Sequence, residues 1–249
     1  EMLDGRVKTL HPKIHAGILH DRKKKTHLKE MKGKKFPSID LIIVNFYPFQ
    51  KVVTETKNHE HIINNIDIGG PTMVRAAAKN FKNVSIITNI DDYKEFIREL
   101  LKGKGSTELE YREKLASKAF ALTAYYDAMI TNWINKKLQI DFPDRKVIFG
   151  RKYKSLRYGE NPHQKAAIYI NDFKDRETGL KIIHGKDLSF NNYSDIYSSL
   201  DILSYFKKSN TTVIIKHGNP CGVSSNRSRL LSFKNAFACD PVSEFGGII

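Results

Sequence analysis

A lysine and a histidine stand side by side where a hydrophobic run ends, in the stretch VIIKHGNPCG at residues 213–222. The apolar, β-branched residues before them predict a buried strand that stops at about Lys216 and leads into a Gly-Asn-Pro-Cys-Gly turn. Ligands of open α/β sheets bind at the carboxyl ends of strands. Adjacent residues of a continuing strand point to opposite faces, so joint chemistry by Lys216 and His217 requires a bend, which Gly218 permits. The alternative is a solvated lysine beside a histidine that merely begins a turn.

Five basic side chains crowd into DGRVKTLHPKIH at residues 4–15, before the first predicted strand: Arg6, Lys8, His11, Lys13 and His15. Such a segment can grip an anion. His11 and His15 have the i, i+4 spacing of a zinc-binding helix. However, Pro12 lies between them and the glutamate of the HExxH motif is absent, so the pattern argues against a metal site.

The stretch IDIGGPTMVRAAAKN at residues 66–80 combines a carboxylate, two glycines and two cations. Asp67 precedes a predicted helix, on which Arg75 and Lys79 are four residues apart and share one face. Glycine amides at a helix start, a carboxylate and two cations can hold a phosphorylated or enolate-like substrate and move protons. Spacing alone favours the structural alternative, an acidic residue at the helix start and basic residues facing solvent.

The stretch RYGENPHQ at residues 157–164 places many polar side chains around a glycine and a proline: Arg157, Tyr158, Asn161, His163 and Gln164. A Gly/Pro turn with so many polar groups is typical of a binding loop. An ordinary surface loop that forms its own hydrogen bonds is the structural alternative.

The elements that must position these residues alternate between strand and helix patterns. Strands are predicted at Leu41–Val44 and 83–89, with a loop and then an Ala-rich helix between them. A helix with one apolar stripe follows at 91–103, and a long helix at about 108–137. This alternation predicts a parallel sheet covered by helices, an α/β fold.

A charged segment with Pro143 and Gly150 marks the predicted domain boundary, which gives domains at residues 1–140 and 141–249. The second domain continues with RYGENPHQ, a strand at AAIYI, a turn at HGKDLSFNN, a helix within 193–208, and the strand that ends at Lys216.

The composition fits a globular protein with a strong basic excess. The formal net charge is +15, and lysines cluster in DRKKKTHLKEMKGKKF at residues 21–36. That cluster could bind nucleic acid, but it has no interleaved aromatic residues for base stacking, so a solvated helix and loop is the favoured interpretation. Two cysteines are too few for a disulfide framework, and no secretory signal or membrane-spanning run occurs, so we expect a cytoplasmic protein without a membrane partner.

Seven motifs, in order and spacing, resemble the family that joins 5-aminoimidazole-4-carboxamide ribonucleotide (AICAR) formyltransferase to inosine monophosphate (IMP) cyclohydrolase. They are EMLDGRVKTLHPKIHAGIL, DLIIVNFYPF, IDIGGPTMVRAAAKN, LRYGENPHQ, LSFNN, IIKHGNPCG and CDPVSEFGGII. The resemblance covers essentially the whole chain and implies an internal fragment of a bifunctional purine-biosynthesis enzyme. It implies a methylglyoxal-synthase-like α/β sandwich with its start missing, then the first part of a cytidine-deaminase-like formyltransferase domain.

The resemblance also implies roles for individual residues. Catalytic positions of the cyclohydrolase match Lys8, Tyr47, Asp67 and Lys79, and the catalytic pair of the formyltransferase matches Lys216 and His217. Nucleotide-binding positions match Arg157, Tyr158, His163, Phe190 and Asn191. The implied co-substrate is 10-formyltetrahydrofolate, without a metal, and the implied assembly is a homodimer. Because both sites would be incomplete, we expect the fragment to be inactive alone.

Two other classes of function compete with this enzyme. A nucleic-acid-binding module would use the lysine cluster and show steeply salt-dependent binding, which the enzyme does not require. A regulatory small-molecule domain would need only the first fold and leaves RYGENPHQ and IIKHGNPCG unexplained.

Overall fold

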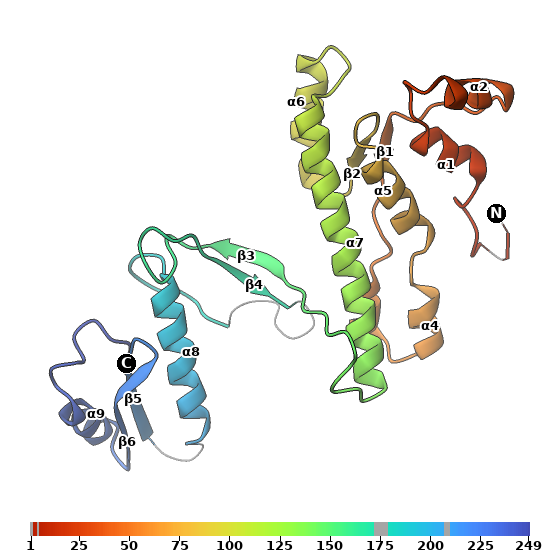
Figure 1. The fold of residues 1–249 in the computed structure, drawn as a ribbon. Helices are drawn as coiled ribbons and strands as arrows, with labels where there is room; N and C mark the ends of the chain where they lie inside the picture. The colour runs from red at the N-terminus through yellow and green to blue at the C-terminus, as the bar shows by residue number, and fades with distance from the viewer. Residues whose placement is uncertain (1, 4, 172–178, 207–209) are drawn as a thin grey trace. The chain divides into compact units, whose positions relative to one another are not determined.

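The computed structural model describes residues 2–3, 5–171, 179–206 and 210–249. It divides into two compact units, Glu1–Phe149 and Gly150–Ile249, and each is described by itself (Figure 1). The division falls after the predicted boundary at 140/141, because residues 141–149 contact the long helix of the first unit. The Asn132 side-chain amide donates to the Val147 carbonyl at 3.2 Å, and the Phe149 ring meets the Tyr125 ring edge-on at 5.2 Å.

The first unit is mainly helical around one short parallel pair of strands. In chain order it contains α1 (Pro12–Leu19), α2 (Lys25–Gly33), β1 (Leu41–Ile43), α3 (Phe49–Glu55), α4 (His59–Asn64), α5 (Gly69–Lys79), β2 (Ser85–Ile87), the 3-10 helix η1 (Ile90–Asp92), α6 (Tyr93–Lys102) and α7 (Leu109–Lys137). The predicted parallel pairing is confirmed, since Leu41 pairs with Ser85 and Ile43 with Ile87. The helices predicted before β2, after β2 and at 108–137 are also confirmed. The lysine cluster forms α2 and its flanking loops.

The core of the first unit lies where α5 and α7 pack beside β2 (Figure 1). All three residues of β2 are buried. Ala77 and Ala78 of α5 and Ala119 of α7 are almost completely buried. Alanine side chains at these positions allow the helices to approach closely, and apolar burial here supplies most of the stabilisation.

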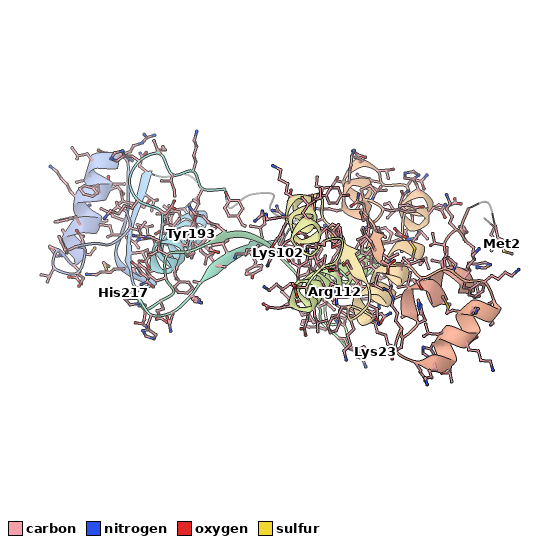
Figure 2. All side chains as sticks on the ribbon, turned by 90° about the horizontal axis from the view of Figure 1, so that it is seen from above. Met2, Lys23, Lys102, Arg112, Tyr193 and His217 are labelled. Atoms are coloured by element: carbon pink, nitrogen blue, oxygen red, sulfur yellow. The ribbon has the colours of Figure 1, made fainter. Side chains whose placement is uncertain are left out.

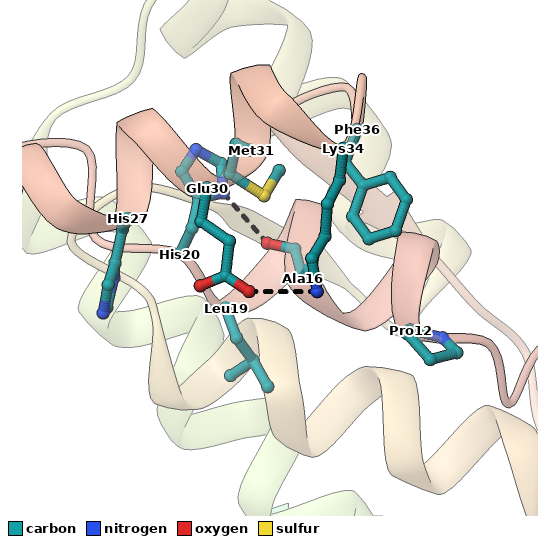
Figure 3. A pocket seen from close by; sticks show the side chains of 9 residues that line it. All are labelled: Pro12, Ala16, Leu19, His20, His27, Glu30, Met31, Lys34 and Phe36. Atoms are coloured by element: carbon teal, nitrogen blue, oxygen red, sulfur yellow. Dashed lines mark hydrogen bonds and ion pairs between the residues drawn. The ribbon is translucent and has the colours of Figure 1, made fainter.

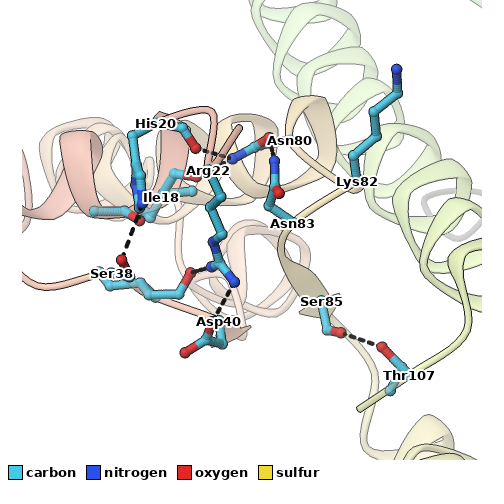
Figure 4. Close-up of polar contacts among 12 residues, drawn as sticks. Ile18, His20, Arg22, Ser38, Asp40, Asn80, Lys82, Asn83, Ser85 and Thr107 are labelled. Carbon is cyan, nitrogen blue, oxygen red and sulfur yellow. Dashed lines mark hydrogen bonds and ion pairs between the residues drawn. The ribbon is translucent and has the colours of Figure 1, made fainter. Parts of the chain in front are cut away.

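A polar network ties the end of α1 to the end of α5 (Figure 4). The Asn80 side-chain amide donates to the carbonyls of Ile18 and His20 at 2.7 and 3.2 Å. The buried His20 ring contacts the Ala16 carbonyl through Nδ1 at 3.0 Å and the Ser38 hydroxyl through Nε2 at 3.1 Å. The bond to Ile18 satisfies a carbonyl that the last turn of α1 leaves without a helical partner.

Among its described residues, the second unit has two antiparallel strand pairs and two helices. It contains β3 (Arg151–Ser155), β4 (Ala167–Ile170), α8 (Phe190–Ser204), β5 (Asn210–Lys216), β6 (Asn219–Asn226) and α9 (Arg229–Cys239). β3 pairs with β4, and β5 pairs with β6. The strand at AAIYI and the end of β5 at Lys216 are confirmed. The helix predicted within 193–208 begins earlier, at Phe190, and residues 207–208 lie outside the described residues.

The turn predicted at Gly-Asn-Pro-Cys-Gly is wrong in its extent. Only His217 and Gly218 form the loop, with φ of 53° and 74°, and the chain returns at once as β6. Positive φ at both central residues is the condition for a two-residue type I′ hairpin. Pro220 is tolerated within β6 at an irregularity in the pairing between Ile214 and Ile215. Because β5 pairs antiparallel with β6, Lys216 and His217 do not lie at the crevice of an open parallel sheet.

No helix in the described part of the chain is both long enough and apolar enough to cross a membrane.

Gly222 allows α9 to pack directly on β6, which gives a stability prediction. A Cβ at this position would lie 2.0 Å from the backbone carbonyl oxygen of Ala236. We expect Gly222→Ala to destabilise the second unit by about 1–3 kcal/mol or more, because the obstacle is backbone and cannot rotate away. Gly33→Ala is the matched control, since a Cβ there has no neighbour within 4 Å. Urea unfolding of both variants measures the difference, and equal midpoints would contradict the packing described here.

Candidate functional site

The start of α5 is the place where candidate residues of the first unit meet. The Asp67 carboxylate accepts hydrogen bonds from the backbone N–H of Gly70 at 2.8 Å and from that of Tyr47 at 3.3 Å. A Cβ at Gly70 would lie 2.5 Å from Asp67 Oδ2, and a Cβ at Gly69 would lie 2.4 Å from Thr9 Oγ1. Gly69 therefore permits the close approach of the distant Thr9 segment, and Gly70 permits that of the Asp67 carboxylate.

Lys8 lies near the start of α5, because its neighbour Thr9 lies against Gly69. The Lys8 side chain is exposed. The Arg6 guanidinium donates to the Asn64 side-chain oxygen at 2.7 Å, which attaches the same segment to the end of α4. His11 is the N-cap of α1 and accepts from the backbone N–H of Lys13 through Nδ1. The proposed anion-gripping segment therefore lies beside the start of α5, with His11 engaged in capping.

Lys79 is the predicted residue that the structure does not bring to Asp67. It is the last residue of α5, exposed, whereas Asp67 precedes the first residue, Gly69. At 1.5 Å per residue, the helix separates its two ends by about 15 Å. Asp67 and the backbone of Tyr47 are in contact, but Lys79 lies at the far end of the helix.

Tyr126 of α7, which is not among the residues predicted from the sequence, contacts the loop that carries Asp67. The backbone N–H of Asp67 donates to the Tyr126 hydroxyl at 2.9 Å, and the hydroxyl donates to the Asn65 carbonyl at 3.4 Å. In the sequence, Tyr126 is one of many aromatic residues on a long apolar helix, which indicates core packing. No signal in the sequence distinguishes it from the others.

In the second unit, the first turn of α8 carries Phe190 and Asn191. Ser189 and Asn192 form a capping box, in which each side chain accepts from the backbone N–H of the other. This cap fixes the helix start at Phe190, whose side chain is exposed. The Asn191 side-chain amide donates to the Glu160 carbonyl at 3.2 Å, which connects the helix to the loop RYGENPHQ.

The RYGENPHQ loop is closed by hydrogen bonds of its own. Gln164 accepts from the N–H of Gly159 through its carbonyl and from that of Asn161 through its side chain, each at 2.8 Å. The Arg157 guanidinium lies over the Tyr158 ring, 5.5 Å from its centroid, and His163 is exposed. These internal hydrogen bonds are what the alternative of an ordinary surface loop predicts. They fix the backbone of the loop and leave Arg157 and His163 facing solvent.

The hairpin tip with Lys216 and His217 is held by a buried carboxylate that the sequence analysis also missed. Asp195 of α8 is 6 % exposed, and its Oδ1 accepts from the backbone N–H of Gly218 at 2.7 Å. His217 is exposed at the tip (Figure 2), and Lys216 is half-buried. Because Asp195 and Asn191 are four residues apart, one face of α8 holds both the hairpin and the RYGENPHQ loop.

The segment after α9 lies against the other edge of β5. Ile215 and Ile248 exchange two backbone hydrogen bonds at 2.9 and 2.8 Å. Hydrogen bonds from Ser243 hold the pKa of Asp240 below its usual range, and the positive charge of Lys216 lowers it further. Burial raises the pKa of Glu244, whose carboxylate oxygens have no hydrogen-bond partner among the described residues.

A pocket of about 290 Å³ lies between α1 and α2 (Figure 3). The Glu30–Lys34 ion pair, at 3.1 Å, lies among its lining residues, and none of the predicted catalytic residues lines it. No group of three or more His, Cys, Asp or Glu side chains that could hold a metal occurs within the part of the chain that the structure describes.

Comparison with known proteins supplies the family. Residues 77–249 match the family model described as "AICARFT/IMPCHase bienzyme". The chain belongs to this family. The matched residues of this bienzyme family include Lys79 and every candidate residue of the second unit. Lys8, Tyr47 and Asp67 precede them.

Curated relatives in the bienzyme family match the whole chain, including Lys8, Tyr47 and Asp67. They are described as "Bifunctional purine biosynthesis protein PurH", and the chain is 47% identical to the one from Bradyrhizobium diazoefficiens and 44% identical to the one from Persephonella marina. Each match covers 100% of this chain, and 48% and 49% of the relatives. The chain thus spans about half the length of the curated relatives it matches. A solved structure described as "Crystal structure of ForH" is 34% identical, with a TM-score of 0.48, over 54% of this chain and 69% of that chain.

The Asp195–Gly218 hydrogen bond gives a prediction about the hairpin. We expect Asp195→Ala to accelerate amide hydrogen exchange at residues 217–219 roughly 5–30-fold, because loss of this charged acceptor costs about 1–2 kcal/mol. Asp201→Ala, at an exposed position of the same helix, is the matched control. Exchange measured by mass spectrometry decides the matter, and equal rates in the two variants would show that Asp195 does not hold the turn.

Proposed function

We propose that the protein catalyses the last two steps of IMP synthesis: formyl transfer from 10-formyltetrahydrofolate to AICAR, then closure of the formylated nucleotide to IMP. Membership of the bienzyme family is the observation that carries the proposal. The distribution of the candidate residues supports it, because the two sets lie in different compact units. On this proposal, the first unit belongs to a methylglyoxal-synthase-like cyclohydrolase and the second to a cytidine-deaminase-like formyltransferase.

The second unit would carry the formyl transfer. The 5-amino nitrogen of AICAR attacks the formyl carbon, the bond from that carbon to N10 of the folate breaks, and N10 takes up a proton as tetrahydrofolate leaves. His217 takes the proton that the attacking amine loses, and Lys216 stabilises the negative charge on the formyl oxygen. The exposed hairpin tip leaves His217 accessible to substrate. Arg157, Tyr158, His163, Phe190 and Asn191 would bind the nucleotide.

The first unit would carry the ring closure. The carboxamide nitrogen of the formylated nucleotide attacks the formyl carbon, and the formyl oxygen leaves as water. Lys8 would stabilise the charge on that oxygen, while Asp67 and Tyr47 orient groups and relay protons. Lys79 is assigned to the same reaction on the resemblance alone, because α5 separates it from Asp67.

The proposal extends to surroundings and partners. We expect small-molecule nucleotide substrates, a folate co-substrate, no metal requirement, a homodimer and a cytoplasmic location. The competing hypothesis of a nucleic-acid-binding module receives no support from the comparisons. Residues of its basic segment also form ion pairs, between Lys34 and Glu30 inside the segment and between Arg22 and Asp40 just outside it.

A two-substrate assay tests the assignment in the protein expressed from its complete reading frame. IMP formation is followed from AICAR plus 10-formyltetrahydrofolate and, separately, from the preformed formyl nucleotide. We expect His217→Ala to lower the first rate by about 10²–10⁴-fold and to spare the second, because general-base catalysis contributes that much. We expect Lys8→Ala to make the formyl nucleotide accumulate.

Lys23→Ala is the control for loss of a positive charge, since Lys23 is exposed within the basic segment and has no proposed role (Figure 2). If the parent forms no IMP, the proposed function is wrong. If the parent is active and neither His217→Ala nor Lys8→Ala changes either rate, the residue assignment is wrong.

A further inference from the structure

Tyr126 occupies a place between two loops that carry candidate catalytic residues. Its ring meets the Phe46 ring edge-on at 5.1 Å and the Phe49 ring at 6.1 Å, and these residues flank Tyr47. Its hydroxyl contacts the backbone of Asn65 and Asp67. One side chain of α7 therefore contacts both the loop of Tyr47 and the loop of Asp67.

The hydroxyl contacts decide how the Asp67 backbone is held. The Tyr126 oxygen accepts from the Asp67 N–H and its proton points to the Asn65 carbonyl, so both backbone groups are satisfied between α4 and α5. The Asp67 side chain is held separately, by the N–H groups of Gly70 and Tyr47. Backbone and side chain of Asp67 are therefore fixed by independent bonds, and only those to its backbone come from α7.

This arrangement requires Tyr126 to remain protonated. Burial raises the pKa of Tyr126, and the charges of Asp67 and Asp127 raise it further, although the hydrogen bond from the Asp67 backbone acts in the opposite direction. A neutral hydroxyl can accept and donate at once, whereas a phenolate could only accept. At neutral pH the side chain therefore keeps both contacts.

We propose that Tyr126 is a positioning residue for ring closure: it holds the Asp67 backbone, from which the catalytic carboxylate extends, beside the Tyr47 loop. The inference rests on the proposed cyclohydrolase reaction. Tyr126 acts through Asp67, so removal of its hydroxyl should loosen the placement of the carboxylate without removing any group that binds the nucleotide. A displacement of about 1 Å in a catalytic group can cost roughly 100-fold in rate.

The helix itself offers a matched control. Tyr111 also lies on α7 and is 8 % exposed, compared with 3 % for Tyr126, but its hydroxyl has no hydrogen-bond partner among the described residues. Tyr111→Phe and Tyr126→Phe delete the same atom from the same helix. Only the second deletion removes contacts to a candidate site.

The experiment combines kinetics with a double-mutant cycle in the protein from its complete reading frame. We expect Tyr126→Phe to lower kcat for ring closure roughly 10–100-fold, with KM changed less than about threefold and with formyl transfer unchanged. Tyr111→Phe should match the parent. In an Asp67→Ala background, Tyr126→Phe should change kcat less than about twofold, because its effect passes through Asp67.

Hydrogen exchange at residues 65–68 gives a readout that does not depend on activity. It should rise in Tyr126→Phe and not in Tyr111→Phe. Unchanged exchange, equal kcat in the parent and Tyr126→Phe, or additive effects in the cycle would each overturn the proposal. Joint loss of formyl transfer and ring closure would overturn it too, because it would assign Tyr126 to folding alone. If the parent closes no ring, the proposed function fails, and the exchange measurement still decides whether Tyr126 holds the Asp67 loop.

Discussion

The close contact at Gly69 and Gly70 is the constraint on which the first unit's candidate site depends. A helix start leaves backbone N–H groups without partners inside the helix, and here the Asp67 carboxylate accepts one of them. That bond forces the carboxylate against the Cα of Gly70, where a Cβ would not fit. Thr9 takes the equivalent space beside Gly69. A larger residue at Gly69 would push away the Thr9 segment that carries Lys8, and a larger residue at Gly70 would displace the Asp67 carboxylate that accepts from Tyr47.

In the second unit, a side chain from the interior of a helix holds the loop that carries the candidate catalytic residues. Its hairpin turns in two residues, and a non-glycine residue, His217, adopts positive φ there. Such a conformation is uncommon for residues other than glycine, so neighbouring contacts must hold it. The buried carboxylate of Asp195 supplies one, through the N–H of Gly218. In both units, then, a carboxylate that accepts a backbone N–H holds a loop that carries a candidate catalytic residue.

Local patterns in the sequence were sufficient for much of the fold. Periodicity identified α6 and α7, and the strand–helix–strand order identified the parallel pairing of β1 with β2. The hairpin was missed because Pro220 and Gly222 are turn formers by local preference, and only pairing with β5 places them in a strand. The helix α1 was not predicted, although Pro12 occupies its first turn, a position that proline favours.

The candidate site was less predictable, because its contacts join segments far apart in the chain. The sequence predicted Asp67 before a helix and Lys79 on that helix, but not the bounds of the helix, and α5 at Gly69–Lys79 places the two residues near its opposite ends. The motif resemblance implied a catalytic role for both residues. In the structure, Asp67 precedes the start of α5 and Lys79 is its last residue. Resemblance identifies residue types that chemistry needs, whereas long-range contacts decide which of them can act together.

Tyr111 and Tyr126 also show that the sequence does not reveal the long-range contacts of a residue. Both are buried tyrosines of α7. Burial raises the pKa of each, and it raises that of Tyr111 to about 12. A buried hydroxyl without a partner costs about 1–3 kcal/mol, so the core tolerates Tyr111 at a cost and gains from Tyr126. The Tyr126 hydroxyl contacts the Asp67 loop, whereas the Tyr111 hydroxyl has no hydrogen-bond partner among the described residues. A residue classed as core by its helical position can therefore hold the loop of a candidate catalytic residue, and its partners, not its type or its burial, reveal that contact.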